Sequence, residues 1–255
     1  MKIAVTGKGG VRKTTFAAVL ARLYADEGQK VICADVDPDA NLGLALGFSE
    51  EELAAITPIT EMKELIKERT HADEFEKFFK LNPKVDDLPE MLAHEKNGVR
   101  LLLMGTIKTG GSGCVCPEHV ILKRLLTHLI IGREDVVIMD MEAGLEHLAR
   151  GTTDWVDQFI VVVEPGARSI QTYNSVKRLA ADLGITHVSV VGNKVRDEKD
   201  EAFIRDSVPE DALLGFIHLS DKVADADRQC ASPYDIADDA VEEIRRIKNK
   251  IDSIS

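Results

Sequence analysis

The sequence predicts an α/β protein with a doubly wound, mostly parallel β-sheet and a phosphate-binding loop after its first strand. Short apolar runs alternate with amphipathic helical stretches along the 255 residues. Most of these runs are continuously apolar, which is typical of strands covered on both faces. Strand–helix alternation of this kind produces a parallel sheet with helices on both sides.

The expected elements follow from these patterns in order. Strands are predicted at residues 3–6, 31–34, 99–104, 136–139, 159–163, 188–191 and 213–217. Helical patterns include residues 14–27, 120–130 and 170–183. The segment 49–98 is charged and mostly helical in pattern, so we expect an insertion at the edge of the sheet within a single domain that spans residues 1–255.

Composition narrows the class of protein. Hydrophobic residues make up 44% and charged residues 30%, as in an ordinary globular domain. The net charge of −12 argues against a nucleic-acid-binding protein with a general basic surface. Four cysteines are too few for a disulfide framework, so we expect a reducing, cytoplasmic location. The sequence shows neither a signal peptide nor an apolar run long enough to span a membrane, and we expect no membrane partner.

A glycine-rich loop lies between the first predicted strand and the first helix. Its backbone N–H groups and the helix N-terminus would hold the phosphates of ATP. Lys13 would reach the β- and γ-phosphates, and the Thr14 hydroxyl would bind Mg²⁺. The loop predicts an ATP-binding site, and its candidate residues are Gly7, Lys8, Gly9, Gly10, Val11, Arg12, Lys13, Thr14 and Thr15.

The extra lysine near the start of this loop, Lys8, is the mark of the deviant Walker A class. The segment resembles the nitrogenase iron protein, MinD and ParA group of ATPases. The resemblance implies a dimer in which Lys8 reaches across the interface to the partner's nucleotide, and gives Lys8 and Lys13 catalytic roles.

One position departs from the pattern. Arg12 precedes Lys13, where the P-loop motif and the resembled group call for glycine. A side chain there occupies space near the phosphates that glycine leaves free. Arg12 either hinders nucleotide binding or points outward and is tolerated; we favour impaired binding.

Acidic residues follow two further strands. Asp35 and Asp37 come at the end of the second strand, and Asp140 ends an apolar run of the Walker B type. The carboxyl ends of parallel strands form the ligand crevice of such a sheet. The pattern predicts that Asp140 holds Mg²⁺ through water, with Asp35 nearby in a supporting position. The resemblance implies that Asp37 lies in switch I and positions or activates the attacking water, while Asp39 is expected only to solvate the turn.

Two later segments complete the nucleotide-binding pattern. Residues 142–147, including Gly144, occupy the position of switch II, where glycine allows the backbone to move between nucleotide states. Asn193 belongs to an Asn-Lys pair after a predicted strand. The resemblance implies that Asn193 recognises adenine.

Cys114 and Cys116 form a Cys-Val-Cys motif in a glycine-rich loop. Both thiols of such a pair can face one metal ion, but two thiolates do not complete a tetrahedral site. A twofold dimer would bring four sulfurs together, and thiolates suit Zn²⁺ or Ni²⁺. Unligated thiols and a reversible disulfide remain open alternatives. Cys33 is expected in the core, and Cys230 is assigned no role.

Three segments narrow the resemblance further. Residues 110–117, 140–148 and 163–165 are similar to those of the CooC-type nickel-insertion ATPases of carbon monoxide dehydrogenase maturation. The resemblance covers nearly the whole chain. It implies an ATP-driven homodimer that carries Ni²⁺ at the paired cysteines and delivers it to carbon monoxide dehydrogenase or the associated acetyl-CoA synthase.

Two other functions compete with this interpretation. A MinD- or ParA-like positioning ATPase would bind a membrane or DNA, and the apolar stripe of residues 241–251 is the feature that favours it. We expect that stripe to pack against the sheet instead. A pseudo-ATPase that binds only metal or a partner is supported by Arg12 alone.

Overall fold

The strands of this computed structural model form one continuous sheet. The structure describes residues 1–37, 39–72, 79–105, 116–131, 134–142, 156–182, 184–185 and 188–254. Within these residues the sheet has eight strands in the order β3-β4-β2-β5-β1-β6-β7-β8, and neighbours are parallel except β3 and β4. The strands are β1 (Lys2–Gly7), β2 (Val31–Asp35), β3 (His94–Lys96), β4 (Val99–Leu103), β5 (Val136–Asp140), β6 (Gln158–Val163), β7 (Val188–Val195) and β8 (Leu213–His218).

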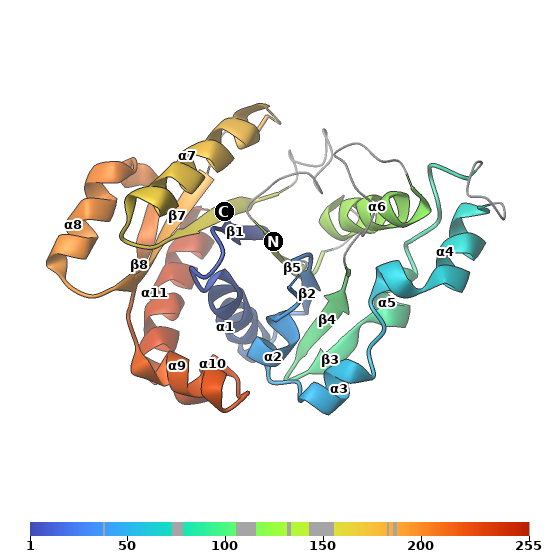
Figure 1. The fold of residues 1–255 in the computed structure, drawn as a ribbon, viewed down its shortest axis with the longest axis horizontal. Coiled ribbons are helices and arrows are strands. Elements are labelled where there is room, and N and C mark those ends of the chain that lie inside the picture. Colours follow the sequence, from blue (N-terminus) through green and yellow to red (C-terminus); the bar gives the residue numbers. More distant parts are fainter. Residues whose placement is uncertain are drawn as a thin grey trace.

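Helices cover both faces of this sheet (Figure 1). One face carries α1 (Lys13–Asp26), α2 (Leu42–Leu46), α9 (Asp221–Arg228), α10 (Pro233–Ile236) and α11 (Asp238–Ile254). The other carries α4 (Lys63–Thr70), α5 (Leu88–Leu92), α6 (Pro117–Ile131), α7 (Ala167–Asp182) and α8 (Glu198–Ser207). Shorter elements are α3 (Glu50–Ala54), η1 (Ile59–Glu61) and η3 (Glu210–Ala212).

Two apolar cores follow from this layering. Ile3 and Val5 of β1 face the core that contains α1 and α11, whereas Ala4 between them faces the core of α6 and α7. Because side chains alternate along a strand, both sets must be apolar, and the strand becomes a continuous apolar run. The predicted doubly wound, mostly parallel fold is confirmed.

The segment 49–98 lies at one edge of the sheet and differs in one respect from the prediction. Besides α3, η1, α4 and α5 it contains the edge strand β3, which pairs antiparallel with β4 through a tight turn. Asn97 and Gly98 in that turn have φ angles of 51° and 76°. The strand was missed because its three residues are polar and largely exposed, so they carry no apolar signal. The single-domain assignment stays a prediction.

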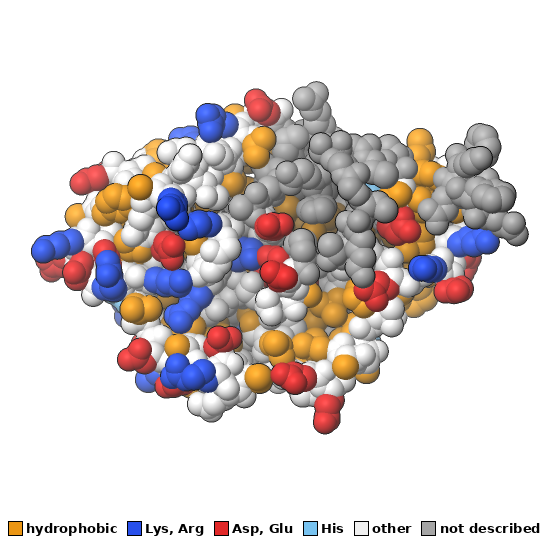
Figure 2. Space-filling view, viewed as in Figure 1, with side chains coloured by type: hydrophobic (Ala, Val, Ile, Leu, Met, Phe, Trp, Pro, Cys, Tyr) orange, Lys and Arg blue, Asp and Glu red, His pale blue; other side chains and the backbone are white. Residues whose placement is uncertain are grey.

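The last helix, α11, buries its apolar stripe. Ile244, Ile247 and Ile251 are almost completely buried in the core shared with α1, as expected for a helix packed on the sheet. Among the residues described, no helix combines the length and apolar character needed to cross a membrane. On the face shown in Figure 2, acidic and basic side chains are interspersed over the described surface.

Candidate nucleotide-binding site

The glycine-rich loop lies at the carboxyl end of β1, between β5 and β6, and leads directly into α1. At Gly7 a Cβ atom would lie 2.6 Å from the carbonyl oxygen of Val162, so only glycine fits beside β6. Gly10 has a φ of 83°, which also favours glycine. The buried Val11 closes the loop through an N–H bond of 3.3 Å to the Lys8 carbonyl.

Arg12 occupies the N-cap position of α1 in the left-handed conformation, with φ 63° and ψ 36°. This conformation gives a second physical reason for the glycine that the motif calls for: a side chain at positive φ strains the backbone by about 1–2 kcal/mol. Arg12 also lines the pocket in front of the loop. That Arg12 impairs nucleotide binding stays a prediction.

Lys13 and Asp37 form an ion pair across the site. Both side chains are about one-tenth exposed, so each charge depends on the other. Burial is the largest influence on the pKa of Lys13 and lowers it, but Asp140, Asp37 and Asp35 together outweigh burial and raise that pKa. Lys13 is therefore fully charged at the position where β- and γ-phosphates would bind.

Asp140, at the end of β5, accepts a hydrogen bond of 2.6 Å from the Thr14 hydroxyl. Burial raises the pKa of Asp140 to about 6, although Lys13 and Thr14 oppose the shift. Asp35, at the end of β2, accepts backbone N–H bonds from Asp37 (3.2 Å) and Leu42 (3.0 Å). Burial, followed by the charge of Asp140, raises the pKa of Asp35 to about 8.

The residues present fit Mg²⁺ held jointly with a nucleotide. The Oδ1 atom of Asp140 is shielded from solvent and has no hydrogen-bond partner among the described residues, an arrangement that a metal-bound water would satisfy. The Thr14 hydroxyl lies beside it. Within the described chain, no group of three or more His, Cys, Asp or Glu side chains is placed to hold a metal without other ligands. Mg²⁺ would therefore depend on Thr14 and on phosphate oxygens.

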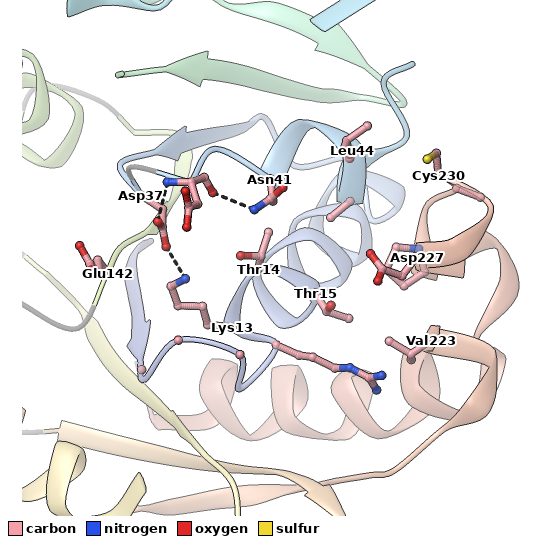
Figure 3. A pocket seen from close by; sticks show the side chains of 18 residues that line it. Lys13, Thr14, Thr15, Asp37, Asn41, Leu44, Glu142, Val223, Asp227 and Cys230 are labelled. Carbon is pink, nitrogen blue, oxygen red and sulfur yellow. Dashed lines mark hydrogen bonds and ion pairs between the residues drawn. The ribbon is translucent and has the colours of Figure 1, made fainter. Parts of the chain in front are cut away.

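A pocket of about 440 Å³ opens in front of the loop (Figure 3). One side is formed by the loop, Lys13, Thr14 and Thr15, and the acidic side by Asp37, Asp39 and Glu142. The opposite wall comes from segments that the sequence analysis did not assign to the site. They contribute Asn41, Leu44, Ala45, Val223, Asp227, Cys230, Ala231 and Pro233.

Asp39 and Cys230 thus lie on the pocket, although the sequence suggested no role for Cys230 and only turn solvation for Asp39. The backbone N–H of Asp39 donates to Asp37 Oδ1 at 2.9 Å. Thr6 donates from its hydroxyl to the Glu142 carbonyl at 2.8 Å, which fixes the start of the predicted switch II. The rest of that switch, including Gly144, lies outside the described residues.

Asn193 lies inside β7, a correction to the expectation that it follows a strand. Its side chain is 3% exposed, donates to the Val11 carbonyl at 2.9 Å and accepts from the Lys194 N–H at 2.7 Å. In this state Asn193 braces the loop and is not among the residues that line the pocket. Its contact with adenine stays a prediction.

Comparison with known proteins identifies the family. The family model of the CobQ/CobB/MinD/ParA nucleotide binding domain matches residues 2–231. The chain belongs to this family. It is a nucleotide-binding ATPase of the deviant Walker A type, as the resemblance predicted.

Two relatives cover almost the whole chain. The chain is 47% identical over 238 residues to the carbon monoxide dehydrogenase accessory protein CooC of Rhodospirillum rubrum, which covers 93% of this chain and 90% of that protein. It is 44% identical over 256 residues to an uncharacterized ATP-binding protein of Methanocaldococcus jannaschii, and this match covers 98% of this chain and 97% of that protein.

Solved structures show the same fold at lower identity. MinD from the MinC:MinD complex of Aquifex aeolicus matches with a TM-score of 0.71 and 19% identity, over 100% of this chain and 97% of that one. MinD of Pyrococcus horikoshii complexed with Mg-ADP matches with a TM-score of 0.66 and 21% identity, and the match covers 98% of this chain and 96% of that one.

The structure places only part of the predicted metal motif. Cys114 lies outside the described residues. Cys116 is partly exposed, directly precedes α6, and its carbonyl accepts the Val120 N–H at 3.1 Å. Cys33 lies in the core of the sheet, as expected, and burial raises the pKa of its thiol.

Lys8, the lysine expected to act across a dimer, is partly exposed and does not line the pocket of its own chain. Its side chain has no ion-pair partner among the residues that the structure describes. Movement of Lys8 toward a second molecule would therefore break no ion pair with a described residue.

Proposed function

We propose that this chain is an ATP-dependent metallochaperone for carbon monoxide dehydrogenase. It would act as a cytoplasmic homodimer, hold Ni²⁺ or Zn²⁺ at Cys114 and Cys116 of both subunits, and help to insert nickel into carbon monoxide dehydrogenase or acetyl-CoA synthase. The observation that carries this proposal is the 47% identity to CooC over 93% of the chain.

The cysteine pair supports the proposal on chemical grounds. Two thiolates spaced two residues apart supply half of a tetrahedral or square-planar set. An isologous dimer contributes the same pair twice, so four sulfurs meet at the twofold axis. The metal is the cargo of this site, and its release must therefore be coupled to a change in the dimer.

ATP binding would supply that change. Lys13 would bind the β- and γ-phosphates, and Thr14 and Asp140 would hold Mg²⁺, which neutralises the charge that develops on the transferred phosphoryl group. Asp37 would orient the attacking water, and Lys8 of each subunit would contact the partner's nucleotide. Hydrolysis would then relax both switches and loosen the four-cysteine site.

The decisive experiment measures metal per subunit and molecular mass, with and without ATP. The proposal predicts half a metal ion per subunit, a dimer by light scattering, and loss of stoichiometric metal in a Cys114→Ala, Cys116→Ala double variant. Retention of half a metal ion per subunit by that variant would rule out the four-cysteine carrier.

The competing MinD- or ParA-like function needs a surface for a membrane or DNA. The stripe of α11 that favoured it is occupied by core packing, with Ile244 and Ile251 fully buried. Co-sedimentation with liposomes in the presence of ATP separates the two functions, because a metal carrier stays in the supernatant.

A further inference from the structure

The wall of the nucleotide pocket that faces the phosphate-binding loop is formed by α2 and by the turn between α9 and α10. Ala45 comes from α2, Ala231 comes from the turn, and Pro233 is the first residue of α10. Val223 and Asp227 of α9 lie on the same wall. The loop amides and Lys13 account for the phosphates. The ribose and base of a bound nucleotide are then left to contact this opposite wall.

The turn in this wall has little regular structure of its own. Cys230 has a φ of 49°, and α10 spans only four residues. Ser232 is buried and donates from its hydroxyl to the Ala45 carbonyl at 2.7 Å, which joins the two halves of the wall to each other. α2 packs against α1 in one apolar core, and a separate side-chain contact joins the turn and α10 to α1.

Tyr234 makes that contact. Its hydroxyl donates to the Asp26 carboxylate, and the Arg22 guanidinium lies 4.5 Å from the centre of its ring. The Arg22 side chain is 11% exposed, and Nη2 lies 3.7 Å from Asp235. Within the part of the chain that the structure describes, Nε and Nη1 of Arg22 have no hydrogen-bond partner, and neither atom contacts solvent, so the aromatic ring is a principal contact of this nearly buried cation.

Asp26 and Arg22 both belong to α1, and a third partner of the Tyr234 phenol, Arg245, belongs to α11. Helix α1 begins with Lys13 and Thr14, which face the phosphate end of the pocket. One rigid helix therefore sets the distance between the phosphate-binding loop and the opposite wall. Partial burial of the Tyr234 phenol, followed by its bond to Asp26, raises its pKa, although Arg245 opposes the shift.

We propose that Tyr234 is a positioning residue for the ribose and base of the nucleotide, because it ties the pocket wall to α1 through Asp26 and Arg22. The proposal rests on nucleotide binding at this pocket and is independent of the metal cargo. Tyr234 itself does not line the pocket, so its effect is transmitted through Pro233 and Ala231.

The test compares ATP with inorganic tripolyphosphate, which has the phosphates but neither ribose nor base. Dissociation constants are measured by isothermal titration for the unsubstituted protein, Tyr234→Phe and Tyr234→Ala. Tyr234→Phe loses the hydrogen bond to Asp26, which should raise the Kd for ATP about fivefold. Tyr234→Ala also loses the ring contact with Arg22, which should raise the Kd for ATP about tenfold or more. The Kd for tripolyphosphate should change less than about twofold in both.

Two further variants serve as controls. Tyr24→Phe removes a similar Tyr–Asp bond, from Tyr24 to Asp252 at 2.8 Å, which joins α1 to α11 away from the pocket. It should leave the affinity for ATP unchanged. Asp26→Asn keeps an acceptor for the Tyr234 hydroxyl and should retain the affinity for ATP.

Three results would overturn the proposal. One is an equal loss of ATP and tripolyphosphate affinity in the Tyr234 variants, which indicates general destabilisation of the site. Another is an ATP affinity that Tyr24→Phe lowers as much as Tyr234→Phe does. The third is an unsubstituted protein that binds neither ligand, which would refute the nucleotide site itself.

Discussion

Replacement of Arg12 by glycine should improve both the stability of the protein and its affinity for ATP. Arg12 has a φ of 63° and a ψ of 36° at the start of α1. A left-handed residue other than glycine costs about 1–2 kcal/mol. Glycine avoids that strain but loses about 0.5–1 kcal/mol more chain entropy on folding. The free energy of unfolding of Arg12→Gly should therefore rise by about 0.5–1 kcal/mol.

The effect on nucleotide affinity has two opposing parts. The Arg12 side chain lines the pocket, and a nucleotide that restricts it costs about 1.5–2 kcal/mol of side-chain entropy. The guanidinium also attracts the phosphates, by about 1 kcal/mol at a solvated distance near 4 Å. The difference leaves a net penalty of about 0.5–1 kcal/mol, so Arg12→Gly should bind ATP about two- to fivefold more tightly.

Isothermal titration with Mg²⁺-ATP and urea unfolding measure the two effects separately. Arg12→Ala is the matched control, since it removes the side chain but keeps a Cβ at positive φ. It should gain affinity without the gain in stability. Equal affinities of the unsubstituted protein and Arg12→Gly would show that Arg12 points away from the nucleotide, and the argument for impairment would fail.

Three further predictions concern buried ionisable side chains. Asp140→Asn should lower Mg²⁺-dependent ATP hydrolysis by about 10–100-fold but keep Mg²⁺-free ATP binding; unchanged hydrolysis would remove Asp140 from the metal site. The pKa of Asp35 is raised from 3.8 to about 8 in the folded chain, which therefore holds a proton that the unfolded chain releases. The stability difference between Asp35→Asn and the unsubstituted protein should grow in favour of the variant from pH 4 to 8 in urea unfolding, and parallel curves would contradict this shift. Lys248 is 2% exposed and pairs with two half-exposed carboxylates, so Lys248→Met should lower the free energy of unfolding by about 1–2 kcal/mol; a value near zero would show that these contacts are not stabilising.

The parts of the fold that follow from local pattern could be predicted from the sequence. The continuous apolar run of β1 and the acid at the end of β5 were sufficient to place Asp140 beside the loop, because parallel strands end at a common edge. The apolar stripe of α11 likewise predicted its packing. In each of these elements the residues that form the recognisable sequence pattern are the same residues that pack in the core or line the site.

The opposite wall of the pocket could not be predicted from local sequence patterns. Helix α10, which begins at Pro233 after the N-cap residue Ser232, was not predicted from the sequence. Nothing local to that turn indicates that Ser232 bonds to Ala45, 187 positions earlier in the chain. Asn193 shows the same limit, since an Asn-Lys pair does not reveal that its amide will brace Val11 rather than face the pocket.

We expect nucleotide binding to reach switch I through the ion pair between Lys13 and Asp37. These two nearly buried charges pair with each other, and we predict that Asp37 orients the attacking water once the pair is broken. A γ-phosphate is the competing anion for Lys13, and its arrival leaves Asp37 without its cation. Asp37 accepts the Asp39 N–H, and the Asp39 carbonyl accepts from Asn41, which begins α2. Movement of Asp37 should therefore be passed to α2, which contributes Leu44 and Ala45 to the opposite wall of the pocket, so that this route and α1 both link the phosphate end of the site to that wall.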